Sequence, residues 1–315
     1  MKNIVPLFLF LLAVSCSSNC FGETEALIER IKLLEERVRQ LEIKLADKED
    51  GNTNGQFSLG NNWYYSTTSG ERDEYIEGIF SAMFPEFVRV FGNEAMTHKP
   101  VTIFNAPNES SPMAIPRGKT MQIRIVQGNT SYWAQMIYQL SHEMTHYAFF
   151  SYFPHADQSN YSTIFENEQS SWNEEIVCEA MSLYMLKYVA DNWEKCSLAK
   201  INPTFDSPLK EYLTNEYNRG KGHTLKSAGD AVPFEGFHKN FNKATDARNS
   251  RLAERNYLYD LLIAADAESI GEIRNMYKYF NKEFRHIDYS AWIKGAKKPN
   301  FIEKLSAIQP KLKPL

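Results

Sequence analysis

The sequence has little cysteine. Only four of its 315 residues are cysteines, and two of them, Cys16 and Cys20, lie within the first 22 residues. The other two, Cys178 and Cys196, cannot supply the disulfide framework of a small secreted domain, so we expect two buried thiols. A hydrophobic core must therefore hold the fold together, and a hydrophobic content of 43% is enough to build one.

The chain also lacks a strong charge of either sign. Its formal net charge is −4, and acidic and basic residues are mixed along its length. A protein that binds nucleic acid usually presents a positive surface to the phosphates. The charge therefore excludes nucleic acid as an expected partner. Internal repeats and low-complexity blocks are missing as well, so a repeat protein is not expected.

No apolar run reaches the roughly 18 residues that a membrane-spanning helix needs. The first 22 residues, "MKNIVPLFLFLLAVSCSSNCFG", carry one lysine, an apolar run from Ile4 to Val14 and then small residues, which is the layout of a signal peptide. We predict a secreted or periplasmic protein. Cleavage after Gly22 would release a soluble chain, and we favour it. One alternative to export is an uncleaved membrane anchor. An alternative to cleavage after Gly22 is a lipid anchor at Cys16, because "LAVSC" resembles a lipoprotein box.

A heptad pattern follows over residues 23–50. Its apolar positions alternate spacings of four and three: Leu27, Ile31, Leu34, Val38, Leu41 and Leu45. In a parallel coiled coil, three pairs of opposite charge would join neighbouring chains: Arg30 with Glu35, Arg37 with Glu42, and Lys44 with Glu49. We predict a parallel homo-dimer or homo-trimer through this segment. A lone amphipathic helix packed on its own domain is the alternative.

Four segments thus make up the predicted organisation. A signal peptide at 1–22 and a coiled coil at 23–50 precede a linker at 51–62, which is polar and contains glycine. The main domain spans 63–315.

The main domain is expected to be α+β and mainly helical. A helix is predicted around 74–91, and after it an apolar run and a loop with several prolines lead to "MQIRIV" at 121–126. There Met121, Ile123 and Ile125 point one way and the polar residues the other, as in a half-buried strand. We expect a small sheet packed on the helix that carries the motif described next, followed by a helical subdomain.

The stretch "SHEMTHYAFF", residues 141–150, places His142 and His146 four apart with Glu143 between them. It lies in a long run without glycine or proline, which predicts a helix. Positions four apart share one helical face, so the two histidines can bind a single metal ion. In this motif the glutamate takes the proton from a metal-bound water. Two ordinary helix histidines are the alternative.

A catalytic zinc site needs a third protein ligand and one open position for water. The next candidate segment is "SSWNEEIVCEAMSLYML", where Glu175 and Glu179 fall on one helical face. Cys178 and Ser182, three positions after each glutamate, would let this helix pack closely on the histidine helix. On the residues alone, either glutamate could be the third ligand.

These two segments resemble the gluzincin group of metallopeptidases, which includes the thermolysin-like and zinc aminopeptidase families. In "WNEEIVCE", Trp172 lies three before Glu175, as in the aminopeptidase motif Trp-Leu-Asn-Glu-Gly. This alignment implies that Glu175 is the ligand and that Glu179 orients a ligand histidine by a hydrogen bond. A competing register aligns "EAMSLY" with Glu-Gly-x-Ala-x-Tyr and makes Glu179 the ligand. We favour the first register.

The resemblance implies a Zn²⁺-dependent peptidase that acts on a peptide or protein substrate, with Glu143 as the general base. No glycine follows either glutamate, and the aminopeptidase's substrate-amine motif is not visible, so an aminopeptidase is not implied. The resemblance also makes "MQIRIV" the sheet edge along which the substrate lies extended, with a plain sheet strand as the alternative. A later Tyr or His would stabilise the oxyanion, for which His223 and His238 are candidates.

Two other classes of function compete with the peptidase. One is an oligomeric binding or scaffold protein that retains a peptidase fold without turnover. The other is a structural zinc protein in which Cys178 closes the site as a fourth ligand.

Overall fold

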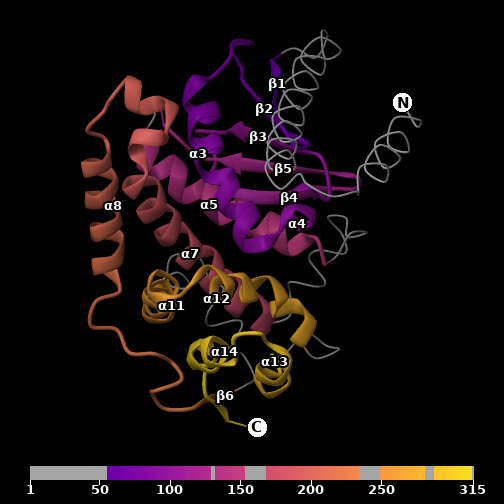
Figure 1. Cartoon of the computed structure of the whole chain (residues 1–315), viewed down its shortest axis with the longest axis vertical. Coiled ribbons are helices and arrows are strands. Elements are labelled where there is room, and N and C mark those ends of the chain that lie inside the picture. Colours follow the sequence, from indigo (N-terminus) through magenta and orange to yellow (C-terminus); the bar gives the residue numbers. More distant parts are fainter. Residues whose placement is uncertain (1–54, 129–131, 153–167, 234–248, 281–286, 314–315) are drawn as a thin grey trace, which may run out of the picture. The chain divides into compact units, whose positions relative to one another are not determined.

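The computed structural model describes most of the main domain and shows that it is α+β and mainly helical (Figure 1). The described residues are 55–128, 132–152, 168–233, 249–280 and 287–313. They belong to one unit of the chain, Asn52–Leu315. The predicted signal peptide and coiled coil lie outside the described residues. Within the described residues, no helix has both the length and the apolar character needed to cross a membrane.

One five-stranded mixed sheet forms the β part of the domain. Its strands are β1 (Gln56–Gly60), β2 (Trp63–Ser66), β3 (Val101–Asn105), β4 (Met113–Arg117) and β5 (Thr120–Ile125). Their order across the sheet is β1-β2-β3-β5-β4. Strands β2, β3 and β5 run parallel, whereas β1 and β4 pair antiparallel at the two edges. A two-stranded parallel pair, β6 (Val232–Pro233) with β7 (Leu312–Lys313), lies apart from this sheet.

The predicted alternation of β5 is confirmed, because Met121, Ile123 and Ile125 are buried while the residues between them are half-buried. The expectation that β5 forms a sheet edge is wrong. It lies between β3 and β4, and the edge strand on this side of the sheet is β4, in a segment that the sequence suggested was a loop with prolines. Pro116 has no N–H to donate, and an edge strand tolerates proline because one side of its ladder needs no partner.

The expected linker is shorter than 51–62, because β1 lies inside it. Gly60, Asn61 and Asn62 all have positive φ angles, of 84°, 55° and 67°, and turn the chain from β1 into β2. Glycine and asparagine tolerate this left-handed conformation. The ring of Phe57 stacks on that of Tyr65, with centroids 5.1 Å apart. The folded domain therefore begins before Trp63.

Helices make up most of the rest of the described chain. The longer ones are α3 (Glu74–Phe91), α5 (Trp133–Phe150), α7 (Glu168–Asp191), α8 (Asp206–Arg219) and α11 (Leu252–Ala264). Short α-helices are α4 (Asn93–Thr97), α12 (Ala267–Gly271), α13 (Tyr289–Gly295) and α14 (Pro299–Leu305). The 3₁₀ segments are η1 (Trp193–Lys195), η2 (Ser197–Lys200), η3 (Glu272–Tyr279) and η4 (Ser306–Ile308).

Helix α3 has the bounds that the sequence predicted. The side chain of Asp73 caps its first turn, accepting hydrogen bonds from the backbone N–H groups of Tyr75 and Ile76 at 2.9 and 3.3 Å. Such a cap satisfies donors that have no partner within the helix.

Helix α5 is the centre of the core. Every residue from Met136 to Phe150 is buried. The helix contacts α3, β4 and β5 as well as α7, which itself contacts α8 and α11. In Figure 1, α7 runs between the part with the sheet and the part with α11 to α14. The expected arrangement, a small sheet on the motif helix followed by a helical part, is confirmed.

Candidate metal site

The two motif histidines lie where α5 packs against α7. Their Nε2 atoms are 3.1 Å apart, and both side chains are buried. Gln139, one turn before His142, fixes this part of α5 to the sheet. Its side-chain amide accepts a hydrogen bond from Val126 N and donates one to Val126 O, each at 2.9 Å. The histidine pair is therefore held at a defined depth beside the end of β5.

The carboxylate of Glu175 on α7 faces both histidines. Its Oε2 lies 3.6 Å from His142 Nε2, and its Oε1 lies 3.5 Å from His146 Nε2. The side chain of Glu175 is 28% exposed, whereas each histidine side chain is only 9% exposed. Burial disfavours the charged carboxylate, but the hydrogen bond with His146 and the charge of Arg251 outweigh it, so the pKa of Glu175 is lowered.

Arg251, next to the start of α11, connects the two candidate ligand glutamates. Its Nη2 donates to Glu175 Oε2 at 3.2 Å and to Glu179 Oε1 at 3.3 Å. Both Arg251 and Glu179 are buried. The structure thus places Glu175 against the histidines and Glu179 one turn further along α7, against the arginine.

The Nδ1 atom of His146, which points away from His142, hydrogen-bonds to Glu174 and not to Glu179. This nitrogen donates to Glu174 Oε1 at 2.5 Å, and the hydroxyl of Tyr277 on η3 donates to the other carboxylate oxygen, Oε2. Glu174 is fully buried, and this burial raises its pKa to about 7, although the hydrogen bond with His146 acts in the opposite direction. A carboxylate on the far nitrogen of a histidine fixes the proton there and leaves Nε2 free to bind a metal.

Glu174 and Tyr277 were not among the residues expected at the site. Glu174 stands directly before Glu175 in "WNEE", so a second carboxylate beside the ligand was visible in the sequence. The direction of the Glu174 side chain was not visible in the sequence. Neighbouring residues on a helix point about 100° apart, and only the packing of α7 on α5 decides which glutamate contacts which histidine nitrogen. Tyr277 lies 103 residues further along the chain.

Cys178 offers a second possible donor from α7. Its Sγ and one ring nitrogen of each histidine all lie within 4.8 Å of one another. The thiol is fully buried, and burial raises its pKa. Burial lowers the pKa of His146, but the contacts with Cys178, Glu174 and Glu175 outweigh it and raise that pKa above its ordinary value.

The remaining residues predicted for the site are Glu143, His223 and His238. Glu143 follows His142 on α5 and is buried, with 3% of its surface exposed. His223 is exposed in the turn after α8, where its backbone N–H donates to Gly220 O at 3.2 Å. His238 lies outside the described residues.

A small cavity of about 90 Å³ borders the site beside His142. Helices α5 and α8 supply most of its lining, together with Pro112, the residue before edge strand β4. Its other lining residues are Gln135, Tyr138, Gln139, Tyr212, Glu216 and Arg219. Of the two motif histidines, His142 therefore borders a cavity on the side where β4 begins.

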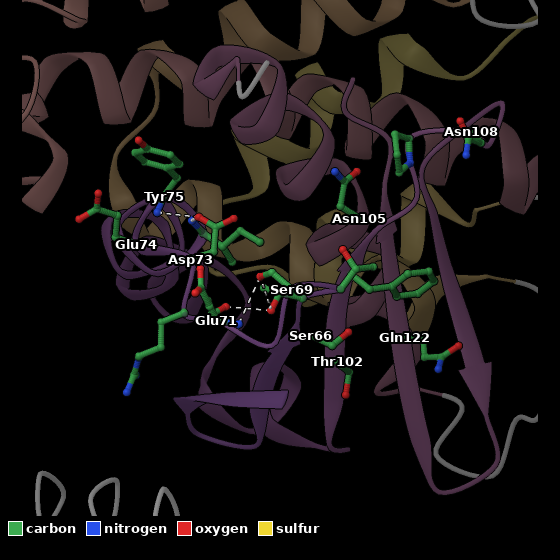
Figure 2. Close-up of a pocket in the computed structure, with 16 residues that line it drawn as sticks. Ser66, Ser69, Glu71, Asp73, Glu74, Tyr75, Thr102, Asn105, Asn108 and Gln122 are labelled. Atoms are coloured by element: carbon green, nitrogen blue, oxygen red, sulfur yellow. Dashed lines mark hydrogen bonds between the residues drawn. The ribbon is translucent and has the colours of Figure 1, made fainter. Parts of the chain in front are cut away.

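A much larger cavity of about 1010 Å³ lies elsewhere, around the start of α3 and the ends of β2 and β3 (Figure 2). None of its lining residues is a histidine or a cysteine. The N-terminus of α3 also offers no free anion site there, because Asp73 already accepts its first N–H groups. The possible metal-binding side chains instead lie beside the smaller cavity, which His142 borders.

Comparisons of this chain with family models, with curated proteins and with solved structures find no match. The function is therefore argued from the site itself.

Proposed function

We propose that this chain is a zinc-dependent peptidase, with His142, His146 and Glu175 as the metal ligands and Glu143 as the general base. The observation that carries the proposal is the spacing of the donor atoms. The two histidine Nε2 atoms lie 3.1 Å apart, and the two carboxylate oxygens of Glu175 lie 3.5 Å from His146 Nε2 and 3.6 Å from His142 Nε2. Zinc bonds of 2.0–2.1 Å in a tetrahedron separate neighbouring donors by about 3.3 Å, which is close to these distances. Three protein ligands leave the fourth position open.

The remaining contacts fit the same role. Glu174 holds the outer nitrogen of His146, as expected of a histidine that binds metal through Nε2. Arg251 compensates the charge of Glu175 from the other side, so this carboxylate stays ionised despite its partial burial.

When bound, zinc would lower the pKa of a coordinated water to about 7 and polarise the substrate carbonyl. Glu143 would accept the proton of the attacking water. It would then pass that proton to the leaving amine, because a carboxylate that has taken up a proton becomes a general acid.

A peptide substrate would lie extended along β4. Within the described residues this strand pairs on one side only, with β5, so its other side can pair with an added strand. Pro112, directly before β4, lines the cavity that His142 borders. The proposal also includes export through residues 1–22 and assembly through residues 23–50, both of which rest on the sequence pattern.

An unbiased peptide-library digest tests the proposal. The purified chain should cleave library peptides, lose this activity with a chelator and regain it with zinc. Glu143→Gln should keep its zinc and its fold but cleave at least about a hundredfold more slowly, because general-base catalysis typically contributes 10²- to 10⁴-fold. Cleavage by Glu143→Gln at the parental rate would refute the mechanism. If both proteins hold zinc and neither cleaves anything, a protein without turnover is favoured over the peptidase.

The position of Cys178 favours a second candidate, a structural zinc site. The thiol of Cys178 and the two histidines form one group of possible donors. If Glu175 also bound the ion, four protein ligands would leave no place for water. Cobalt substitution separates the two candidates. A thiolate-to-cobalt charge-transfer band that disappears in Cys178→Ser would support the closed site, and its absence in the parent would support the open one.

A further inference from the structure

We infer that Tyr277 is a positioning residue for the metal site, acting on His146 through Glu174. The inference rests on the proposed function, since it assumes that His146 binds zinc. It assigns a role to a residue of the helical part of the domain, far in sequence from both motifs.

Glu174 has one oxygen for each neighbour. Oε1 accepts from His146 Nδ1, and Oε2 accepts from the hydroxyl of Tyr277. The carboxylate is fully buried and Tyr277 is 5% exposed, so water does not readily replace either partner. A buried carboxylate oxygen that loses its donor keeps the full cost of its desolvation.

The ring of Tyr277 is held in place by other aromatic rings. Its centroid lies 5.4 Å from that of Phe149 on α5, 5.8 Å from that of Tyr152 and 5.0 Å from that of Phe280. Phe149 follows His146 by three positions on the same helix. The phenol is therefore fixed relative to the helix that carries the histidines.

Fixing one oxygen of Glu174 also fixes the other. With Oε2 held by Tyr277, the carboxylate cannot rotate, and Oε1 stays directed at His146 Nδ1. The proton of His146 then remains on Nδ1, and the Nε2 lone pair stays directed at the point between His142 and Glu175. Loss of an outer hydrogen-bond partner of a metal ligand typically costs 10- to 100-fold in metal affinity.

The test compares Tyr277→Phe with Tyr152→Phe in the full chain. Tyr277→Phe should raise the zinc dissociation constant about 10- to 100-fold in competition with a chromophoric chelator, and should shift the visible spectrum of the cobalt-substituted protein. Tyr152→Phe is the matched control. Its hydroxyl donates at 2.6 Å to the carbonyl of Arg274 instead, so both readouts should stay at the parental values.

A double-mutant cycle with Glu174→Gln tests whether the effect passes through Glu174. Glutamine keeps an oxygen for His146 but replaces the carboxylate oxygen that faces Tyr277. If Tyr277 acts through Glu174, adding Tyr277→Phe to Glu174→Gln should cause little further loss of zinc affinity. This comparison also serves if Tyr277→Phe alone folds poorly. The double variant and Glu174→Gln share the change at Glu174, so the stability and the zinc affinity of these two proteins can be compared directly.

The outcomes are distinct. Parental zinc affinity in Tyr277→Phe, or losses that add in the double variant, would overturn the inference. A parent that binds no zinc would overturn both the inference and the proposed function. Loss of zinc affinity in Tyr277→Phe without any peptidase activity in the parent would support the positioning role and refute the peptidase.

Discussion

At the scale of single residues, two glutamates four positions apart on α7 have different surroundings. Glu175 is partly exposed and faces both histidines, whereas Glu179 is fully buried against Arg251. Glu175 and Glu179 therefore look equivalent in the sequence but have different contacts, and their effects on zinc affinity should differ.

Glu175→Ala should reduce zinc affinity more than Glu179→Ala. The first change removes one of three proposed ligands. The second removes a partner of Arg251 and should cost roughly 10- to 100-fold, as is typical for residues that only orient a ligand. Chelator competition on both variants gives the ranking. The opposite ranking would assign the ligand role to Glu179.

His98 should make the stability of the domain depend on pH. Burial lowers its pKa from 6.5 to about 4, while its Nδ1 lies 2.8 Å from the Ala95 carbonyl oxygen. Because the folded pKa is lower than the unfolded one, the unfolded chain binds more protons between these values. Stability is therefore fully present above about pH 6.5 and falls as the pH drops towards 4, by about 3 kcal/mol at most.

Urea unfolding at several pH values, compared between the parent and His98→Gln, measures this contribution. Glutamine does not titrate, so the difference in unfolding free energy between the two proteins should change from pH 7 to pH 4.5. A constant difference would show that His98 is not the group responsible.

At the scale of elements, α3 is held against η2 at Gly78. A Cβ added there would meet Leu198 Cγ at 2.7 Å and Ser197 Oγ at 2.8 Å. Gly78→Ala should therefore destabilise the domain by about 1–3 kcal/mol through overpacking. Gly128→Ala is the control, because a Cβ there would meet nothing within 4 Å. Equal melting temperatures for the two variants would contradict the close packing of α3 on η2.

The elements that could be predicted are those with a strong local pattern. The helix predicted around 74–91 matches α3, and strict alternation predicted β5. Strands β1, β2 and β4 were not predicted, because each has only four or five residues and depends on pairing with a partner strand rather than on its own sequence. The prolines around β4 also suggested a loop, and only its place at the edge explains why they are tolerated.

The candidate site could be predicted to a similar extent. The spacing of His142 and His146 is local, so a helix brings them together whatever the rest of the chain does. Glu174, Arg251 and Tyr277 depend on how α7, α11 and η3 pack, and no periodicity in the sequence records this packing.

At the scale of the whole molecule, the position of β1 defines where the chain can be divided. Sedimentation of the chain from Glu23 should show a dimer or trimer, whereas deletion of residues 1–51 should give a monomer that keeps its zinc, since β1 starts only at Gln56. A monomeric parent would show that the heptads do not associate between chains. Deletion up to Asn62 is the control that removes β1, and it should lower the melting temperature.

The contacts around Glu174 also determine when the site can exist. His146 meets Glu174 across 28 residues, and Glu174 meets Tyr277 across another 103. During synthesis the histidine helix leaves the ribosome long before η3, and its partners are not yet present. If the chain is exported as proposed, in an unfolded state, it would cross the membrane without a formed site, and the proposed metal would bind only after the chain folds.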